Sequence, residues 1–124
     1  MKILLDTNFI LAPIQLKIDV FKQAENVARG EAEFIILTPV LAELEALSKG
    51  KTKTAHAART MLGYVKKQNW QVMEATGTAD SALLQTAKKL GAAIATGDAV
   101  LRKRAKQAQV RVLVLKGGYS LTLY

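Results

Sequence analysis

The stretch KILLDTNFIL, residues 2–11, contains an apolar run that ends at one acid, Asp6. A short run rich in Ile and Leu is typical of a strand that is covered on both faces of a parallel sheet. The carboxylate at its end loses hydration unless neighbouring groups compensate for its charge. The stretch therefore predicts a first strand at residues 2–6, and it raises the question whether other acids come to lie beside Asp6.

The rest of the sequence alternates between strand-like and helix-like segments. Because parallel neighbours need crossover connections, this alternation predicts an α/β fold of three layers, α/β/α, around a central parallel sheet. Further strands are predicted at 34–38, 92–96 and 110–115, with a weaker one at 70–75 and an edge strand in KGGYSLTLY (116–124). Helices are predicted at 17–29, 39–49, 53–68, 79–90 and 98–108.

Length and composition indicate one domain over residues 1–124. The chain has 124 residues, half of them apolar, no cysteine and no obvious linker, which suits a single core without disulfides. Its apolar runs are too short for a membrane-spanning helix. The beginning lacks the basic, apolar and cleavage regions of a secretory signal. We therefore expect a cytoplasmic protein with no membrane partner.

The chain is strongly basic. Eighteen Lys and Arg against ten Asp and Glu give a formal charge of +8, which favours a polyanionic partner through counterion release. Solvated helix faces that merely aid solubility account for this charge as well. Much of it lies in KGKTKTAHAAR (49–59), in KK at 66–67 and 88–89, and in RKRAK (102–106).

Acids fall where the predicted strands give way to helices. In an open parallel sheet, ligands collect outside the carboxyl ends of the strands. Asp6 ends the first strand, Asp98 follows AAIATG, Asp80 begins ADSALLQTAKKL, and Glu43 lies one helical turn after FIILT. Ordinary structural roles also account for three of them, because an Asp caps helices and Glu favours helix surfaces.

Four acids at one sheet edge are better explained together than singly. Like charges held close together raise one another's pKa, and a divalent cation relieves that repulsion. All the candidate donors are oxygens and cysteine is absent, which favours Mg²⁺ or Mn²⁺ over zinc. His56, the one histidine, is interpreted as a surface or phosphate-contacting residue rather than a metal ligand.

These motifs resemble the PIN-domain family of metal-dependent ribonucleases. The resemblance rests on LLDTN, TPVLAELEAL, ADSALLQTA and ATGDAVLRKRA, which occur in this order and cover nearly the whole chain. It implies a five-stranded parallel sheet with helices on both sides. It also implies that the catalytic acids, which bind the metal, are Asp6, Glu43, Asp80 and Asp98. Asn8 and Thr96 match supporting polar positions, Thr96 as a hydrogen-bonding residue around the site.

Within the family, the chain resembles archaeal proteins similar to the small-subunit processome nucleases. This branch implies a role in ribosomal RNA maturation, with single-stranded RNA or an rRNA precursor as the partner. The alternatives are the toxin of a toxin–antitoxin pair and a non-catalytic module that binds RNA or protein in ribosome assembly. The family also implies a homodimer, and a protein partner is expected for the last two alternatives.

The basic residues are predicted to hold the RNA backbone by charge, with affinity that falls as salt is added. No extra acid follows Asp98 closely, which leaves the number of metal ions open. Three other classes are disfavoured because this sequence lacks a feature that each requires. A receiver domain and a haloacid-dehalogenase-like phosphatase each need an acid that is absent here, and a P-loop site needs a glycine-rich turn after the first strand. The residues predicted to contact RNA are Lys49, Lys51, Lys53, Arg102 and Arg104.

Overall fold

Six strands form one sheet in the part of the chain that the computed structural model describes, residues 1–116 and 120–124. The strands are β1 (Lys2–Leu5), β2 (Glu33–Leu37), β3 (Gln71–Met73), β4 (Ala93–Ala95), β5 (Val112–Lys116) and β6 (Ser120–Leu123). They lie in the order β3-β2-β1-β4-β5-β6. The first five are parallel, and β6 pairs antiparallel with β5.

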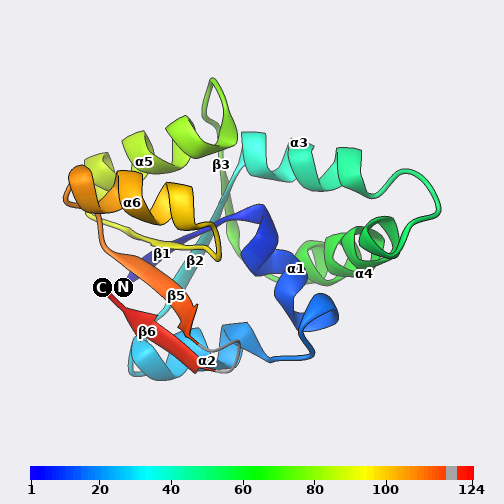
Figure 1. Ribbon diagram of the computed structural model, residues 1–124, viewed down its shortest axis with the longest axis horizontal. Helices are drawn as coiled ribbons and strands as arrows, with labels where there is room; N and C mark the ends of the chain where they lie inside the picture. The colour runs from blue at the N-terminus through cyan, green and yellow to red at the C-terminus, as the bar shows by residue number, and fades with distance from the viewer. Residues whose placement is uncertain (117–119) are drawn as a thin grey trace.

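Helices cover both faces of this sheet. They are α1 (Thr7–Gln15), α2 (Val20–Val27), α3 (Thr38–Leu47), α4 (Lys53–Lys67), α5 (Ala79–Leu90) and α6 (Ala99–Gln107). In Figure 1, α5 and α6 lie on one side of the sheet, whereas α1, α2 and α4 lie on the other. Helix α3 contacts α1, α4 and α5. The predicted three-layer α/β/α class is confirmed, and the predicted edge strand makes the sheet six-stranded where the family resemblance implied five strands.

The helices predicted for the beginning of the chain need correction in two respects. Residues 7–15 form α1 although no helix was predicted there, and the helix predicted at 17–29 is reduced to α2. Pro13 lies inside α1, and a proline normally argues against a helix interior. Lys17 has a positive φ of 55°, which separates the two helices. Burial of the apolar face of α1 overrides the proline signal.

The edge strand predicted in KGGYSLTLY lies partly outside the described residues. Residues 117–119 lie outside the residues that the structure describes, whereas Ser120–Leu123 form β6. The backbone of Tyr124 continues the pairing, because its N–H donates to the carbonyl of Val112 at 2.8 Å and its carbonyl accepts from the N–H of Val112 at 3.2 Å. The end of the chain therefore lies against the beginning of β5.

The core is continuous on both sides of the central strands. Ile3, Leu4 and Leu5 of β1 are fully buried, and each buried aliphatic side chain contributes about 1.5–3 kcal/mol. Phe21 of α2 contacts the rings of Phe34, Tyr64 and Trp70 at centroid distances of 5.7, 5.6 and 5.0 Å. Among the helices of the described residues, none combines the length and the apolar character that crossing a membrane requires.

The order of the strands determines where a ligand fits. The chain passes from β1 to β2 and β3 on one side, and then returns to β4 and β5 on the other side of β1. The connections therefore diverge between β1 and β4. In sheets of this kind, the crevice at the carboxyl ends of such a strand pair is where ligands bind.

Candidate active site at the ends of β1 and β4

Asp6 follows β1 directly and is only 5% exposed. Its backbone N–H donates to the carbonyl of Ala95 at 3.0 Å, which continues the pairing of β1 with β4. Its side chain caps α1, because Oδ1 accepts a hydrogen bond from the N–H of Thr7 at 2.8 Å. Asp6 therefore ends a strand and begins a helix, and both hold its carboxylate at the crevice between β1 and β4.

Thr96 joins the ends of the two strands. Its hydroxyl donates to Oδ2 of Asp6 at 2.7 Å and accepts from the N–H of Asp98 at 3.0 Å. Thr96 is almost completely buried, so these hydrogen bonds are protected from water. The register that pairs Leu5 with Ala95 brings the threonine beside the aspartate.

A second link between these strand ends involves Asn8. The backbone N–H of Gly97 donates to Oδ1 of Asn8 at 2.9 Å. Gly97 is not among the glycines with a positive φ angle. Its backbone N–H instead contacts the asparagine, so the segment between β4 and α6 is held by Asn8 and Thr96.

The charges of Glu43 and Asp80 reach Asp6. Burial raises the pKa of Asp6 most, and the nearby carboxylates of Asp80 and Glu43 raise it further. The hydrogen bonds from Thr96 and from the N–H of Thr7 act in the opposite direction and lower this pKa. Three of the four predicted acids therefore interact electrostatically at one edge of the sheet.

Asp98 lies at the same edge but its side chain is engaged with α6. Its Oδ1 accepts from the N–H groups of Val100 at 2.8 Å and Leu101 at 3.3 Å, which caps the helix. The structural role considered for this acid is therefore present. Its backbone N–H nevertheless connects it to Asp6 through Thr96.

Comparison with known protein families agrees with this geometry. Residues 3–118 match the family described as PIN like domain. The chain belongs to the PIN-like domain family. The resemblance stated from the sequence is thereby confirmed for almost the whole chain.

Two curated relatives of this PIN-like domain are ribonucleases by name. Ribonuclease VapC4 of Methanocaldococcus jannaschii is 30% identical over 118 residues, which cover 93% of this chain and 90% of the relative. Ribonuclease VapC9 of Archaeoglobus fulgidus is 33% identical over 114 residues, which cover 90% of this chain and 80% of the relative. Both relatives are therefore similar over their main length, not over a fragment.

Solved structures share the fold of this PIN-like domain. The PIN domain endonuclease Utp24 superposes with a TM-score of 0.80 at 24% identity, covering 98% of this chain and 90% of the other. VapBC2 of Rickettsia felis, solved with a DNA fragment from its promoter, contains a chain with a TM-score of 0.69 at 15% identity, covering 94% of this chain and all of that one. At these identities the likeness is one of fold.

The acids of this PIN-like domain fit a hard cation by donor chemistry. Within residues 1–116 and 120–124, no three acidic or histidine side chains are arranged as a ready metal site. Mg²⁺, however, commonly keeps several waters and takes only one or two carboxylates from the protein. The charge coupling of Asp6 with Glu43 and Asp80 supplies the repulsion that such an ion relieves.

The two arginines predicted to bind RNA lie in different surroundings. Nη1 of Arg104 is 3.9 Å from Oδ2 of Asp80, so this arginine faces the acidic group. Arg102 instead lies over the ring of Tyr124, with 4.4 Å between its guanidinium carbon and the ring centroid. The sequence placed them together because they are two residues apart, but that separation on a helix turns them to different sides.

Of the lysines predicted to bind RNA, Lys49 and Lys51 lie in the loop between α3 and α4, and Lys53 is the first residue of α4. Lys49, Lys51 and Lys53 are exposed. Arg59 holds this loop, because its Nη1 donates to the carbonyls of Ser48 at 2.8 Å and Gly50 at 2.7 Å. No separate role was predicted for Arg59, since only the fold shows that its side chain reaches back over the loop.

One further polar side chain at the site was missed. The hydroxyl of Thr7 is buried and has no hydrogen-bond partner within the described residues. Its position next to Asp6 in DTN was the available signal. From the sequence alone, Thr7 resembles any threonine in the first turn of a helix, because the burial of Thr7 and Asp6 is known only from the structure.

Proposed function

We propose that this chain is a divalent-metal-dependent endoribonuclease that hydrolyses phosphodiester bonds in RNA. The observation that carries the proposal is the Asp6 carboxylate at the β1–β4 crevice, whose pKa is raised first by burial and then by the charges of Asp80 and Glu43. The names of the two ribonuclease relatives support the same reaction. The formal charge of +8 suits a polyanionic substrate.

Asp6, Glu43, Asp80 and Asp98 are the residues that would hold Mg²⁺ or Mn²⁺. When bound, such an ion polarises the scissile phosphate and lowers the pKa of a water. Thr96 keeps the Asp6 carboxylate oriented and lowers its pKa, which favours the ionised form that binds a cation. Asn8 fixes the Gly97 backbone beside it. Arg104 balances the charge of Asp80.

The test is cleavage of a labelled single-stranded RNA by Asp6→Asn and Asp98→Asn. We expect each variant to lose activity by about 10²-fold or more, because a few kcal/mol of transition-state stabilisation depend on the ion. Glu45→Gln is the matched control, since Glu45 is an exposed acid two residues from Glu43 on the same helix. Undiminished cleavage by the Asp6→Asn and Asp98→Asn double variant would refute the proposal.

Metal binding separates the enzyme from a non-catalytic RNA- or protein-binding module. Isothermal titration of the chain with Mn²⁺ is expected to show binding that Asp6→Asn weakens. Absence of binding at millimolar Mn²⁺ would favour the module. The same titration with Mg²⁺ ranks the two ions for this donor set.

For the cellular substrate we favour precursor ribosomal RNA. This choice rests on the resemblance of ELEALSKGKTKTAHAAR and TGDAVLRKRAKQAQVRVLVLKG to the processome branch. Incubation with a precursor rRNA transcript is expected to give discrete cuts that require Asp6. Uniform degradation, or no cutting of a precursor while other RNA is cleaved, would contradict this choice.

The second candidate is the ribonuclease toxin of a toxin–antitoxin pair. The names of the VapC relatives, 30% and 33% identical, favour it, and the fold it shares with the VapBC2 structure is consistent with a protein partner. Expression of the chain in a bacterial host separates the two roles. A toxin arrests growth unless Asp6 is replaced, whereas a processing nuclease leaves growth unchanged.

A further inference from the structure

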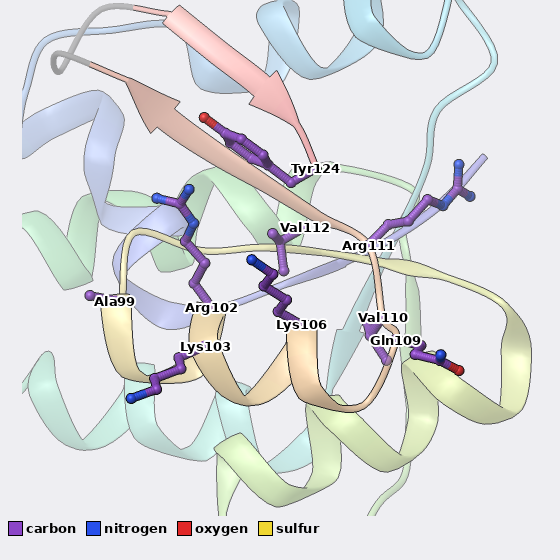
Figure 2. Close-up of a pocket in the computed structure, with 9 residues that line it drawn as sticks. All are labelled: Ala99, Arg102, Lys103, Lys106, Gln109, Val110, Arg111, Val112 and Tyr124. Carbon is purple, nitrogen blue, oxygen red and sulfur yellow. The ribbon is translucent and has the colours of Figure 1, made fainter.

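A cavity of about 690 Å³ lies between α6 and the beginning of β5, and its lining starts at Ala99, one residue after Asp98 (Figure 2). Four of its lining residues are cations and none is an acid. An opening with that charge attracts anions. The cations are Arg102, Lys103, Lys106 and Arg111.

The cavity extends along one face of α6. Ala99, Arg102, Lys103 and Lys106 line it, and this spacing of three, four and seven residues places them on the same side of a helix. Ala99 directly follows Asp98. The eight residue steps from Asp98 to Lys106, at 1.5 Å each, cover about 12 Å. This is the length of roughly three to four stacked nucleotides in one nucleic-acid strand. An RNA strand that passes Asp98 at the N-terminus of α6 is therefore long enough to reach this face of α6.

An aromatic ring and apolar side chains form another part of the lining. Tyr124 is 43% exposed as a residue, and Val110 and Val112 are buried beside it. Figure 2 shows Arg102 and Lys106 extending from α6 toward Tyr124, whereas the guanidinium of Arg111 points away. Charge and a flat ring thus occur together, which is the combination that single-stranded nucleic acids require.

We infer that this cavity is a subsite for an unpaired nucleotide of the RNA strand, a binding site separate from the acids. The inference rests on the proposed ribonuclease function. Arg102 and Lys106 contact the phosphate backbone, and the base packs on the exposed ring of Tyr124, beside Arg102. A paired base has its faces covered by its neighbours, so the subsite selects single-stranded RNA. An acidic peptide would use the cations but has no flat base for the ring.

Two variants separate the charged and aromatic contributions. Binding of a fluorescent oligouridine of about eight nucleotides is measured by anisotropy with EDTA present, so that cleavage does not interfere. Arg102→Ala with Lys106→Ala is expected to weaken binding about tenfold and to reduce the salt slope by about 1.4, since each single-strand contact contributes about 0.7. Tyr124→Leu is expected to weaken binding severalfold with the salt slope unchanged.

Lys66→Ala with Lys67→Ala is the matched control, because it removes the same charge from the end of α4, away from the cavity lining. Equal losses in the control and in the Arg102/Lys106 variant would overturn the subsite, and so would unchanged binding by both test variants. Thermal unfolding checks that each variant folds. If an acidic peptide displaces RNA from wild type and from Tyr124→Leu equally, the cavity is a peptide site.

The outcome is distinguishable from failure of the proposed function. Cleavage with Mn²⁺ is measured separately on wild-type protein and Asp6→Asn. RNA binding that depends on Arg102, Lys106 and Tyr124 without any metal-dependent cleavage would retain the subsite and reject the nuclease. Cleavage that is insensitive to these three residues, together with unchanged RNA affinity, would retain the nuclease and reject the subsite.

Discussion

The Thr96 hydroxyl serves two groups at once, Asp6 Oδ2 and the Asp98 N–H. Because its hydrogen bond lowers the pKa of Asp6, Thr96→Val is expected to raise that pKa. The acidic side of the pH–cleavage profile then moves to higher pH, since less of Asp6 is ionised at a given pH. Stability is also expected to fall by about 1–3 kcal/mol, because the buried Asp6 carboxylate and the partly buried N–H of Asp98 each lose a partner.

Thr96→Ser is the control, since it keeps the hydroxyl and removes only a methyl group. The measurement is the pH dependence of cleavage for the three proteins, with unfolding followed in parallel. Identical pH profiles for wild type and Thr96→Val would show that this hydroxyl does not tune the acid.

At the scale of single residues, the sequence predicted positions better than interactions. Asp6 was recognisable because an acid directly follows an apolar run, and the structure places it at the end of β1. Its hydrogen bond to Thr96 spans 90 residues and depends on the pairing of β1 with β4. No local pattern reports that register, so the exact partner of the hydroxyl was not predictable from the sequence. The separation of Arg102 from Arg104, in contrast, follows from their spacing of two residues on a predicted helix and was overlooked.

At the scale of elements, the loop between α3 and α4 is the clearest candidate for a contact with the phosphate backbone of RNA. Replacement of Lys49, Lys51 and Lys53 by Ala is expected to weaken RNA binding and to reduce its salt slope by about 2, at about 0.7 for each single-strand contact. Arg59 holds the loop through Ser48 and Gly50, so the fold of the loop survives the three changes.

The control for this prediction removes three exposed cations elsewhere, Lys22, Lys66 and Lys67. Anisotropy over a series of salt concentrations gives the slope for each protein. A slope that changes equally in both triple variants, or in neither, would show that the loop faces away from the RNA.

The elements themselves were predicted where apolar periodicity was undisturbed. The helices α3, α4, α5 and α6 appear within one or two residues of their predicted bounds. Helix α1 was missed because Pro13 and an apolar run without charges mask its periodicity. It forms because Asp6 caps it through a local hydrogen bond to Thr7 and because its apolar side chains are buried, which only the tertiary structure shows.

For the whole molecule, the alternation of elements predicted the layers but not the strand order. The order β3-β2-β1-β4-β5-β6 places β1 and β4 side by side, and this neighbourhood brings Asp6, Thr96 and Asp98 to one edge. Segments more than 85 residues apart thus build one site. The geometry of the crevice is a property of the topology, which local sequence patterns do not encode.

The pH dependence of the free energy of unfolding should reflect the ionisation of Asp6 in the crevice between β1 and β4. The pKa of Asp6 is raised in the folded protein, so the folded state holds this proton to higher pH than the unfolded chain does. Between the unfolded and the folded pKa, stability therefore falls as pH rises, and the penalty is complete above the folded pKa. Asp6→Asn lacks this charge. We expect the stability of wild type relative to Asp6→Asn to decrease as pH rises from 4 through that pKa.

A divalent cation should reverse this penalty, because it binds the folded chain and neutralises the acids. With Mn²⁺ at ten times its dissociation constant, wild type is expected to gain about 1.4 kcal/mol, and Asp6→Asn is expected to gain less. Thermal unfolding of both proteins from pH 4 to 8, with and without Mn²⁺, measures both effects. Parallel pH curves for the two proteins would contradict the raised pKa, whereas equal gains with Mn²⁺ would show that the cation binds away from Asp6.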